Sequence, residues 1–145
     1  MKKFPPIEKV YEAWTALADN RVHLHDGYAD VSSSDGEKAY VVRFSGDQYS
    51  SDDNATFWRG YPGYPVMAVL MLQGKLPYAK EEAQNWRNIN WTQINKKHKN
   101  NYAAAVAEIA EERGIDMTKA GAAAQKVIEA LESLPIEIKR KIKTL

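Results

Sequence analysis

Five residues between positions 23 and 43 are of types that can act as acids, bases or anion ligands: His23, His25, Tyr28, Asp30 and Arg43. The dipeptides Asp26-Gly27 and Asp35-Gly36 in the same stretch are typical of two-residue β-hairpin turns. Two such turns predict a three-stranded antiparallel meander over about residues 21–25, 28–33 and 37–45. In that register His23 lies opposite Asp30, and Tyr28 lies opposite Arg43.

The two predicted turns agree on which face of the meander is apolar. That face collects Val22, Leu24, Ala29, Val31, Tyr40, Val42 and Phe44. Every one of these side chains can be buried, and a one-residue slip at either turn would mix the two faces. The agreement between two independent turns therefore supports the register.

The polar face could carry chemistry. Directly opposed side chains in a sheet have Cβ atoms about 4.5–5.5 Å apart, so Asp30 could orient His23 as a general base. Arg43 could bind an anionic group beside this pair. An outer sheet face is also polar simply because it faces water, and both interpretations stay open. His23, His25 and Asp30 have the composition of a two-histidine, one-carboxylate metal site, but a His-x-His pair is common by chance; we expect no metal ion and no cofactor.

A loop rich in tyrosine and proline is the second candidate site. Residues 60–65 read Gly-Tyr-Pro-Gly-Tyr-Pro, which cannot form a helix or a central strand. Its candidate binding residues are Trp58, Arg59, Tyr61 and Tyr64. Rigid aromatic side chains on a loop are typical of recognition surfaces. The alternative is that these aromatics only cover the open end of the core.

Residues 75–99 are the third candidate, because Lys and Arg outnumber Glu there and two tryptophans lie among them. Such a segment could bind phosphates and stack on bases. However, Trp86 and Trp91 recur at the spacing of helical core residues, and the net charge of the chain is only +1. We therefore do not expect nucleic acid to be the main partner.

The remaining patterns predict the elements around these candidates. In chain order they are a helix from Pro5-Pro6 to Asp19-Asn20, a polar loop over 45–54, a short strand at 56–59, a buried helix rather than a strand over 66–72, short helices over 78–88 and from Asn90, and a docked turn near Ile136.

Two further helices are predicted near the C-terminal end, over residues 102–113 and 117–133. Gly114 suits a C-cap and Asp116 an N-cap. Small residues on both helices, Ala105 and Gly121 among them, predict an αα-hairpin in which the backbones approach closely.

Length and composition set the class of protein. We expect residues 1–145 to form a single α+β domain, with 44% hydrophobic and 27% charged residues and no cysteine. The longest apolar run, residues 66–72, is too short to span a membrane, and no apolar segment follows the basic start of the chain. A cytoplasmic protein that does not bind membranes is expected.

Three functions fit these residues. The first is a small ligand- or protein-binding module that uses the polar sheet face and the Tyr-Pro loop. The second is a small acid–base enzyme acting on an anionic substrate through His23, Asp30, Tyr28 and Arg43. The third is a nucleic-acid accessory protein that uses residues 75–99. The sequence does not specify the substrate or partner, the oligomeric state, or whether the protein is an enzyme.

Overall fold

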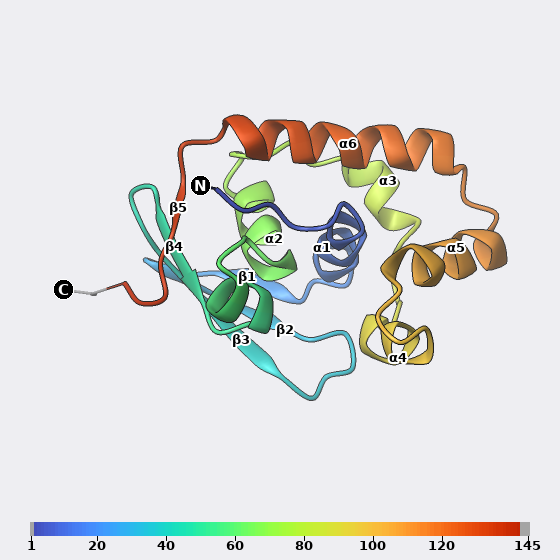
Figure 1. Cartoon of the computed structure of the whole chain (residues 1–145), viewed down its shortest axis with the longest axis horizontal. Coiled ribbons are helices and arrows are strands. Elements are labelled where there is room, and N and C mark those ends of the chain that lie inside the picture. The colour runs from blue at the N-terminus through green and yellow to red at the C-terminus, as the bar shows by residue number, and fades with distance from the viewer. Residues whose placement is uncertain (1, 143–145) are drawn as a thin grey trace.

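The computed structural model describes residues 2–142, which form an α+β fold (Figure 1). The elements in chain order are α1 (Lys9–Ala18), β1 (Val22–Leu24), β2 (Tyr28–Ser32), β3 (Ala39–Ser45), β4 (Gln48–Ser51), a short π-helix η1 (Ala55–Arg59), α2 (Tyr64–Leu72), α3 (Lys80–Gln84), α4 (Trp91–Lys97), α5 (Tyr102–Arg113), α6 (Met117–Ser133) and β5 (Glu137–Ile138). The predicted N-terminal helix, strand meander and helical C-terminal half are confirmed.

Five strands form one sheet in the order β1-β2-β3-β4-β5. The first four are an antiparallel meander, and β5 joins β4 in parallel. The predicted register is confirmed, since His23 pairs with Asp30 and Tyr28 with Arg43. The turn type differs from a type I′ turn, because only the glycines, Gly27 at φ 81° and Gly36 at φ 75°, lie in the left-handed region.

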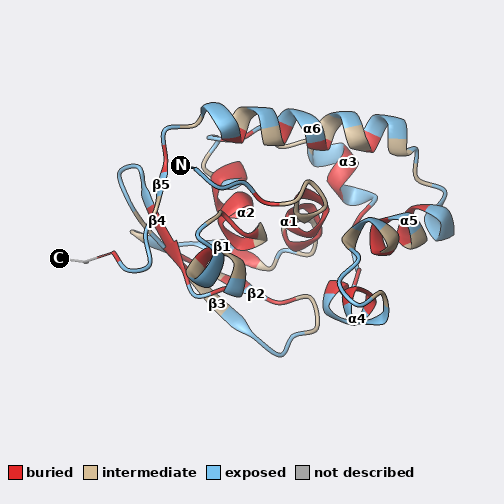
Figure 2. Ribbon diagram, viewed as in Figure 1, coloured by how far each residue is buried: buried red, intermediate tan, exposed pale blue. Residues whose placement is uncertain are grey.

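The core lies between one face of the sheet and the helices α1 and α2. Helix α2 is apolar all round, and its residues from Pro65 to Met71 are buried between α1 and the strands. Figure 2 shows the two helices in the colour of buried residues, whereas α6 crosses above them with one side exposed. The predicted choice of helix over strand for residues 66–72 is confirmed.

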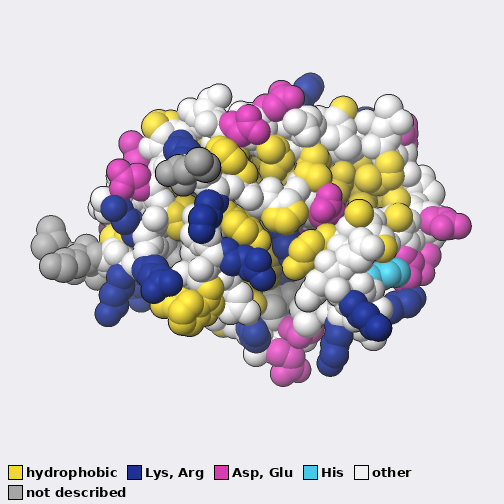
Figure 3. Space-filling model, viewed as in Figure 1, with side chains coloured by type: hydrophobic (Ala, Val, Ile, Leu, Met, Phe, Trp, Pro, Cys, Tyr) yellow, Lys and Arg dark blue, Asp and Glu magenta, His cyan; other side chains and the backbone are white. Residues whose placement is uncertain are grey.

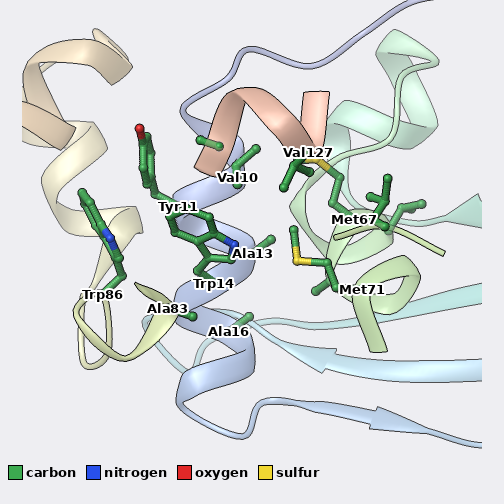
Figure 4. Close-up of a cluster of buried hydrophobic side chains, with 14 of the residues drawn as sticks. Val10, Tyr11, Ala13, Trp14, Ala16, Met67, Met71, Ala83, Trp86 and Val127 are labelled. Carbon is green, nitrogen blue, oxygen red and sulfur yellow. The ribbon is translucent and has the colours of Figure 1, made fainter. Parts of the chain in front are cut away.

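An aromatic cluster joins α1 to the segments that follow α2. The rings of Tyr11 and Trp86 stack at 4.4 Å, and Trp14 meets Tyr11 edge to face (Figure 4). Thr15 is completely buried beside them; its hydroxyl donates to the carbonyl of Trp86 and accepts from Nε1 of Trp91 at 2.8 Å. One hydroxyl thus connects the helix to both tryptophans.

Two predicted elements between residues 45 and 59 are wrong. The polar stretch 45–54 contains β4, and the predicted strand 56–59 lies in η1. Strand β4 forms because Gly46, at φ 57°, reverses the chain and lets Val42 pair with Ser51 through to Ser45 with Gln48. Its serines are buried, so the alternation of apolar and polar residues that marks a strand is missing.

Helices α5 and α6 follow one another as predicted, but they do not pack along their small residues. Gly114 ends α5 at φ 65°, and the Asp116 side chain accepts hydrogen bonds from the first amides of α6. A Cβ on Gly121 would meet no atom within 4 Å, so no tight seam exists there. Helix α6 instead buries a stripe at helical spacing toward α1: Ala120, Ala124, Val127 and Leu131. The larger side chains of this stripe remove more apolar surface from water than an alanine seam could.

We predict that Thr15→Val destabilises the fold by about 1–3 kcal/mol. Valine keeps the shape of threonine but removes the hydroxyl, which leaves Trp91 Nε1 and the Trp86 carbonyl without their partner in the core. Thr118→Val, at an exposed position of α6, should change the free energy of unfolding by less than about 0.5 kcal/mol. Urea denaturation of both variants tests this, and equal midpoints would contradict it.

Candidate functional site

A cavity of about 560 Å³ opens between α1, the β2–β3 connection, the η1 segment and α4. We call it the α1–α4 cavity. Its lining is polar and aromatic, and the residues used below are Lys9, Glu12, Tyr40, Asp53, Arg59, Tyr61, Tyr64, Asn95, Lys96, Lys99 and Tyr102. Four separate parts of the chain therefore meet at one concave surface.

Glu12 forms part of the inner wall of the cavity. It is buried because other elements cover α1 on nearly every side. The residue is only 6% exposed, and its Oε2 atom pairs with Lys9 Nζ at 2.8 Å. The Asn95 amide donates to the same oxygen at 3.4 Å. Lys9 Nζ also lies 4.0 Å from the centre of the Tyr102 ring. The buried carboxylate thus has a cation and an amide as partners, as a buried charge requires.

Asp53 forms the other acidic part of the wall and fixes the loop around it. Its Oδ2 atom accepts from the backbone amide and the hydroxyl of Thr56, each at 3.1 Å, and the Thr56 hydroxyl accepts from the Gly63 amide at 2.9 Å. A Cβ on Gly63 would overlap this carboxylate. Burial raises the pKa of Asp53, and hydrogen bonding from the Ser51 side chain and from Thr56 opposes the rise only in part.

Tyrosine rings line the space between the inner wall and the mouth. Tyr40 and Tyr64 meet edge to face with ring centres 6.4 Å apart. Burial raises the pKa of both phenols above the ordinary value, while Arg21 partly opposes the shift at Tyr64. Both hydroxyls therefore stay protonated at neutral pH and can donate a hydrogen bond.

The mouth carries cations. Arg59, Lys96 and Lys99 line the cavity and are exposed, whereas Lys97 on the same helix pairs with Glu108 at 2.7 Å. Figure 3 shows Lys and Arg side chains gathered over the region of α4. After α4, Lys99 at φ 52° and Asn100 at φ 62° both adopt the left-handed conformation that favours glycine.

The predicted polar sheet face exists, but its hydrogen bond joins a different pair. His25 Nε2 lies 2.8 Å from Asp30 Oδ2, although the backbone residue opposite Asp30 is His23. The carboxylate thus reaches the diagonal neighbour, which also stacks on Tyr28 at 4.6 Å. The His25 and Asp30 side chains are 40% and 50% exposed, so water competes with this pair. Arg43 is exposed on β3 opposite Tyr28.

The candidate residues in and around the Tyr-Pro loop divide between two environments. Trp58 and Arg59 lie in η1, and Tyr64 begins α2, so the non-helical loop is shorter than the predicted 60–65. Arg59, Tyr61 and Tyr64 line the α1–α4 cavity, so these three predicted residues lie together with the buried polar groups. Trp58 is 66% exposed and lies against the Arg140 guanidinium, 5.4 Å from its ring centre, rather than in the cavity. Trp86 and Trp91, in the basic segment 75–99, are core residues and do not offer exposed rings for base stacking.

The chain matches one known family model over residues 2–137, that of the uncharacterised conserved protein UCP014422. The chain belongs to this family. No curated protein and no solved structure matches it. Within residues 2–142, no helix is both long and apolar enough to cross a bilayer, and no group of three or more His, Asp or Glu side chains could hold a metal ion.

Sequence reasoning did not select four residues of the cavity wall as site residues: Glu12, Tyr40, Asp53 and Asn95. Glu12 had a weak signal, since it is the only acidic residue inside an otherwise apolar helix centre. Asp53 had none, because it is one of several acidic residues in a stretch that reads as a polar loop.

We predict that Asp53→Asn changes stability in a pH-dependent way. The folded-state pKa of Asp53 lies above the unfolded value of about 3.9, so its favourable contribution is complete below that value and is lost as pH rises through the folded pKa. Asparagine cannot ionise. The free energy of unfolding of the variant, relative to the original chain, should therefore rise from about pH 4 upward and then level off.

Asp35→Asn provides a control of opposite sign. The Ser33 hydroxyl and the Glu37 amide hold the pKa of Asp35 below its ordinary value, so that carboxylate stabilises the fold above the unfolded pKa. This variant should lose stability relative to the original chain as pH rises. Urea titrations from pH 3 to pH 8 measure both; a pH-independent difference for Asp53→Asn would contradict the assigned environment.

We also predict opposite effects for alanine at two glycines. Gly63→Ala should cost about 1–3 kcal/mol, because its Cβ would push Asp53 off Thr56. Gly121→Ala should stabilise the protein by about 0.5–1 kcal/mol, because open space surrounds a helical glycine there. Denaturant midpoints compare the two, and a loss of stability in Gly121→Ala would show that this face of α6 is packed.

Proposed function

We propose that this protein binds a small polar molecule in the α1–α4 cavity. The observation that carries the proposal is a pair of buried acceptors on the cavity wall: Oδ1 of Asp53 and Oδ1 of Asn95 have no hydrogen-bond partner among the described residues. The two residues are 5% and 8% exposed. Folded proteins seldom leave buried polar atoms unpaired, so a ligand that donates hydrogen bonds is the natural partner.

The shape of the surface favours a small molecule over a protein. The cavity is concave, and its volume lies within the range of about 300–1,000 Å³ that is typical of small-molecule sites. Its polar groups converge from four elements, and tyrosine rings supply apolar walls. The sheet face around His23, His25 and Tyr28 is open, because all three residues are exposed. A separate cavity of about 460 Å³ beside Arg43 does not include them.

Binding is better supported than catalysis. Glu12 is occupied by Lys9 and Asn95, and the two raised tyrosine pKa values leave those phenols protonated at neutral pH. The one oriented imidazole, His25 with Asp30, lies on the open sheet face, where water would screen acid–base chemistry. We also propose the cytoplasm as the location, which a chain without cysteine suits.

A protein-observed NMR screen against a library of small polar metabolites tests the proposal. We expect library hits to shift backbone amides of residues 53–64 and 92–102 and to leave residues 23–30 unchanged. Asn95→Leu should weaken binding of those hits by about tenfold or more, since an apolar side chain of similar size removes one wall acceptor.

Gln93→Leu is the matched control, because Gln93 lies on the exposed side of the same helix. It should leave the affinity unchanged. Hits that perturb only the sheet face, or equal losses in the two leucine variants, would contradict the proposed site.

A further inference from the structure

We infer that the ligand of the α1–α4 cavity is amphoteric, with an amino group at the inner wall and a carboxylate or phosphate at the mouth. This inference rests on the proposed function and adds the class of ligand. It follows from how acceptors and cations are distributed between the two ends of the cavity.

The inner end offers acceptors that no cation of the protein satisfies. Lys9 pairs with Glu12, but the ion pairs formed within residues 2–142 do not include Asp53. Asp53 and Asn95 each keep one unpaired oxygen. An ammonium group has three donors and a positive charge, so it suits an inner wall that offers unpaired oxygens and a carboxyl group without a cation partner.

In the absence of a ligand, protein atoms cover these two oxygens. A ligand reaches them when the terminal carboxyl or amide group rotates, and such terminal torsions are broad and cost little to turn. Rotation of the Asp53 carboxyl group also moves Oδ2, so the amide and hydroxyl of Thr56 must follow that oxygen, whereas the bond between Thr56 and the Gly63 amide does not involve Asp53.

The mouth has the opposite character. Arg59, Lys96 and Lys99 line it, and within residues 2–142 no carboxylate lies close enough to form an ion pair with any of them. Neighbouring cations without a counter-ion repel one another, and an anionic group between them relieves that repulsion. Arginine and lysine are also the side chains that bind carboxylates and phosphates most readily.

The backbone at Lys99 gives a second reason to assign binding to the mouth. Lys99 lies in the left-handed region just after α4, where glycine is the usual residue. A lysine there is strained, and such strain concentrates at functional sites. We expect Lys99→Gly to raise the urea midpoint of the protein and at the same time to weaken ligand binding.

Matched sets of probes test the inference by isothermal titration calorimetry. One set is glucosamine 6-phosphate, glucosamine and glucose 6-phosphate; the other is 6-aminohexanoate, hexylamine and hexanoate. Both sets are added to the metabolite library of the preceding screen. Within a set that binds, we expect the amphoteric compound to bind about tenfold or more tightly than either singly charged compound.

Substitutions at the inner wall and at the mouth of the cavity test the two ends of the ligand separately. Lys96→Ala and Lys99→Gly should weaken the amphoteric and anionic probes but leave the amine unchanged, whereas Asn95→Leu should weaken the amphoteric probe and the amine. Lys97→Ala is the control, because Lys97 pairs with Glu108 away from the cavity. It should not change any affinity.

Each outcome is decisive. Neutral or singly charged compounds that bind the cavity as tightly as their amphoteric counterparts would overturn this inference and leave the proposed function standing. If no compound in the sets or the library shifts the cavity resonances, the proposed function itself fails. If the amphoteric compounds bind most tightly, and variants at the inner wall and at the mouth both weaken that binding, the result supports both the proposed function and the proposed class of ligand.

Discussion

The buried polar side chains of α1 are the constraint on which the rest of the structure depends. A helix covered on nearly every side by apolar residues nevertheless carries Glu12 and Thr15 in its centre. Each must find partners in the interior, and both find them in the segment that forms α4: Thr15 accepts from Trp91, and Glu12 accepts from Asn95. These bonds fix where α4 docks, and the α1–α4 cavity is the space left beside that junction.

A separate set of hydrogen bonds among Asp53, Thr56 and Gly63 holds the opposite wall of the cavity. Asp53 binds Thr56, and Thr56 binds the Gly63 amide, so the short π-helix and the Tyr-Pro loop close onto one carboxylate. This arrangement requires glycine at position 63, because a Cβ would occupy the place of the carboxylate. The rings of Tyr61 and Tyr64 are carried into the cavity by the same loop. The same buried polar residues therefore stabilise the fold and line the site, so a substitution at one of them affects both stability and the site.

Local signals made much of the fold predictable. The Asp-Gly dipeptides and the apolar face they imply were enough to obtain the sheet register from Val22 to Phe44. Strand β4 escaped prediction because its residues, Gln-Tyr-Ser-Ser, gain their strand conformation from pairing with β3 rather than from their own pattern. The alanine seam between α5 and α6 was wrong because small residues permit close packing but do not drive it; α6 follows its larger apolar stripe toward α1.

The site was less predictable because it is assembled from distant segments. Arg59, Tyr61 and Tyr64 were chosen from loop chemistry alone and do line the cavity, but Glu12, Asp53 and Asn95 become neighbours only after folding. Side-chain hydrogen bonds were hard to predict even within one sheet. The predicted register is right, with His23 opposite Asp30, but the Asp30 carboxylate bonds to His25 instead.

The central claim is that the α1–α4 cavity holds a small molecule through its unpaired wall acceptors. The most direct measurement is the chemical shift of the Asn95 side-chain amide in ¹⁵N-labelled protein, before and after addition of the small-molecule fraction of a cell extract. We predict a shift at Asn95 together with the amides around Asp53, and none at residues 23–30. Unchanged Asn95 resonances, or shifts centred on the His25 face, would contradict the account.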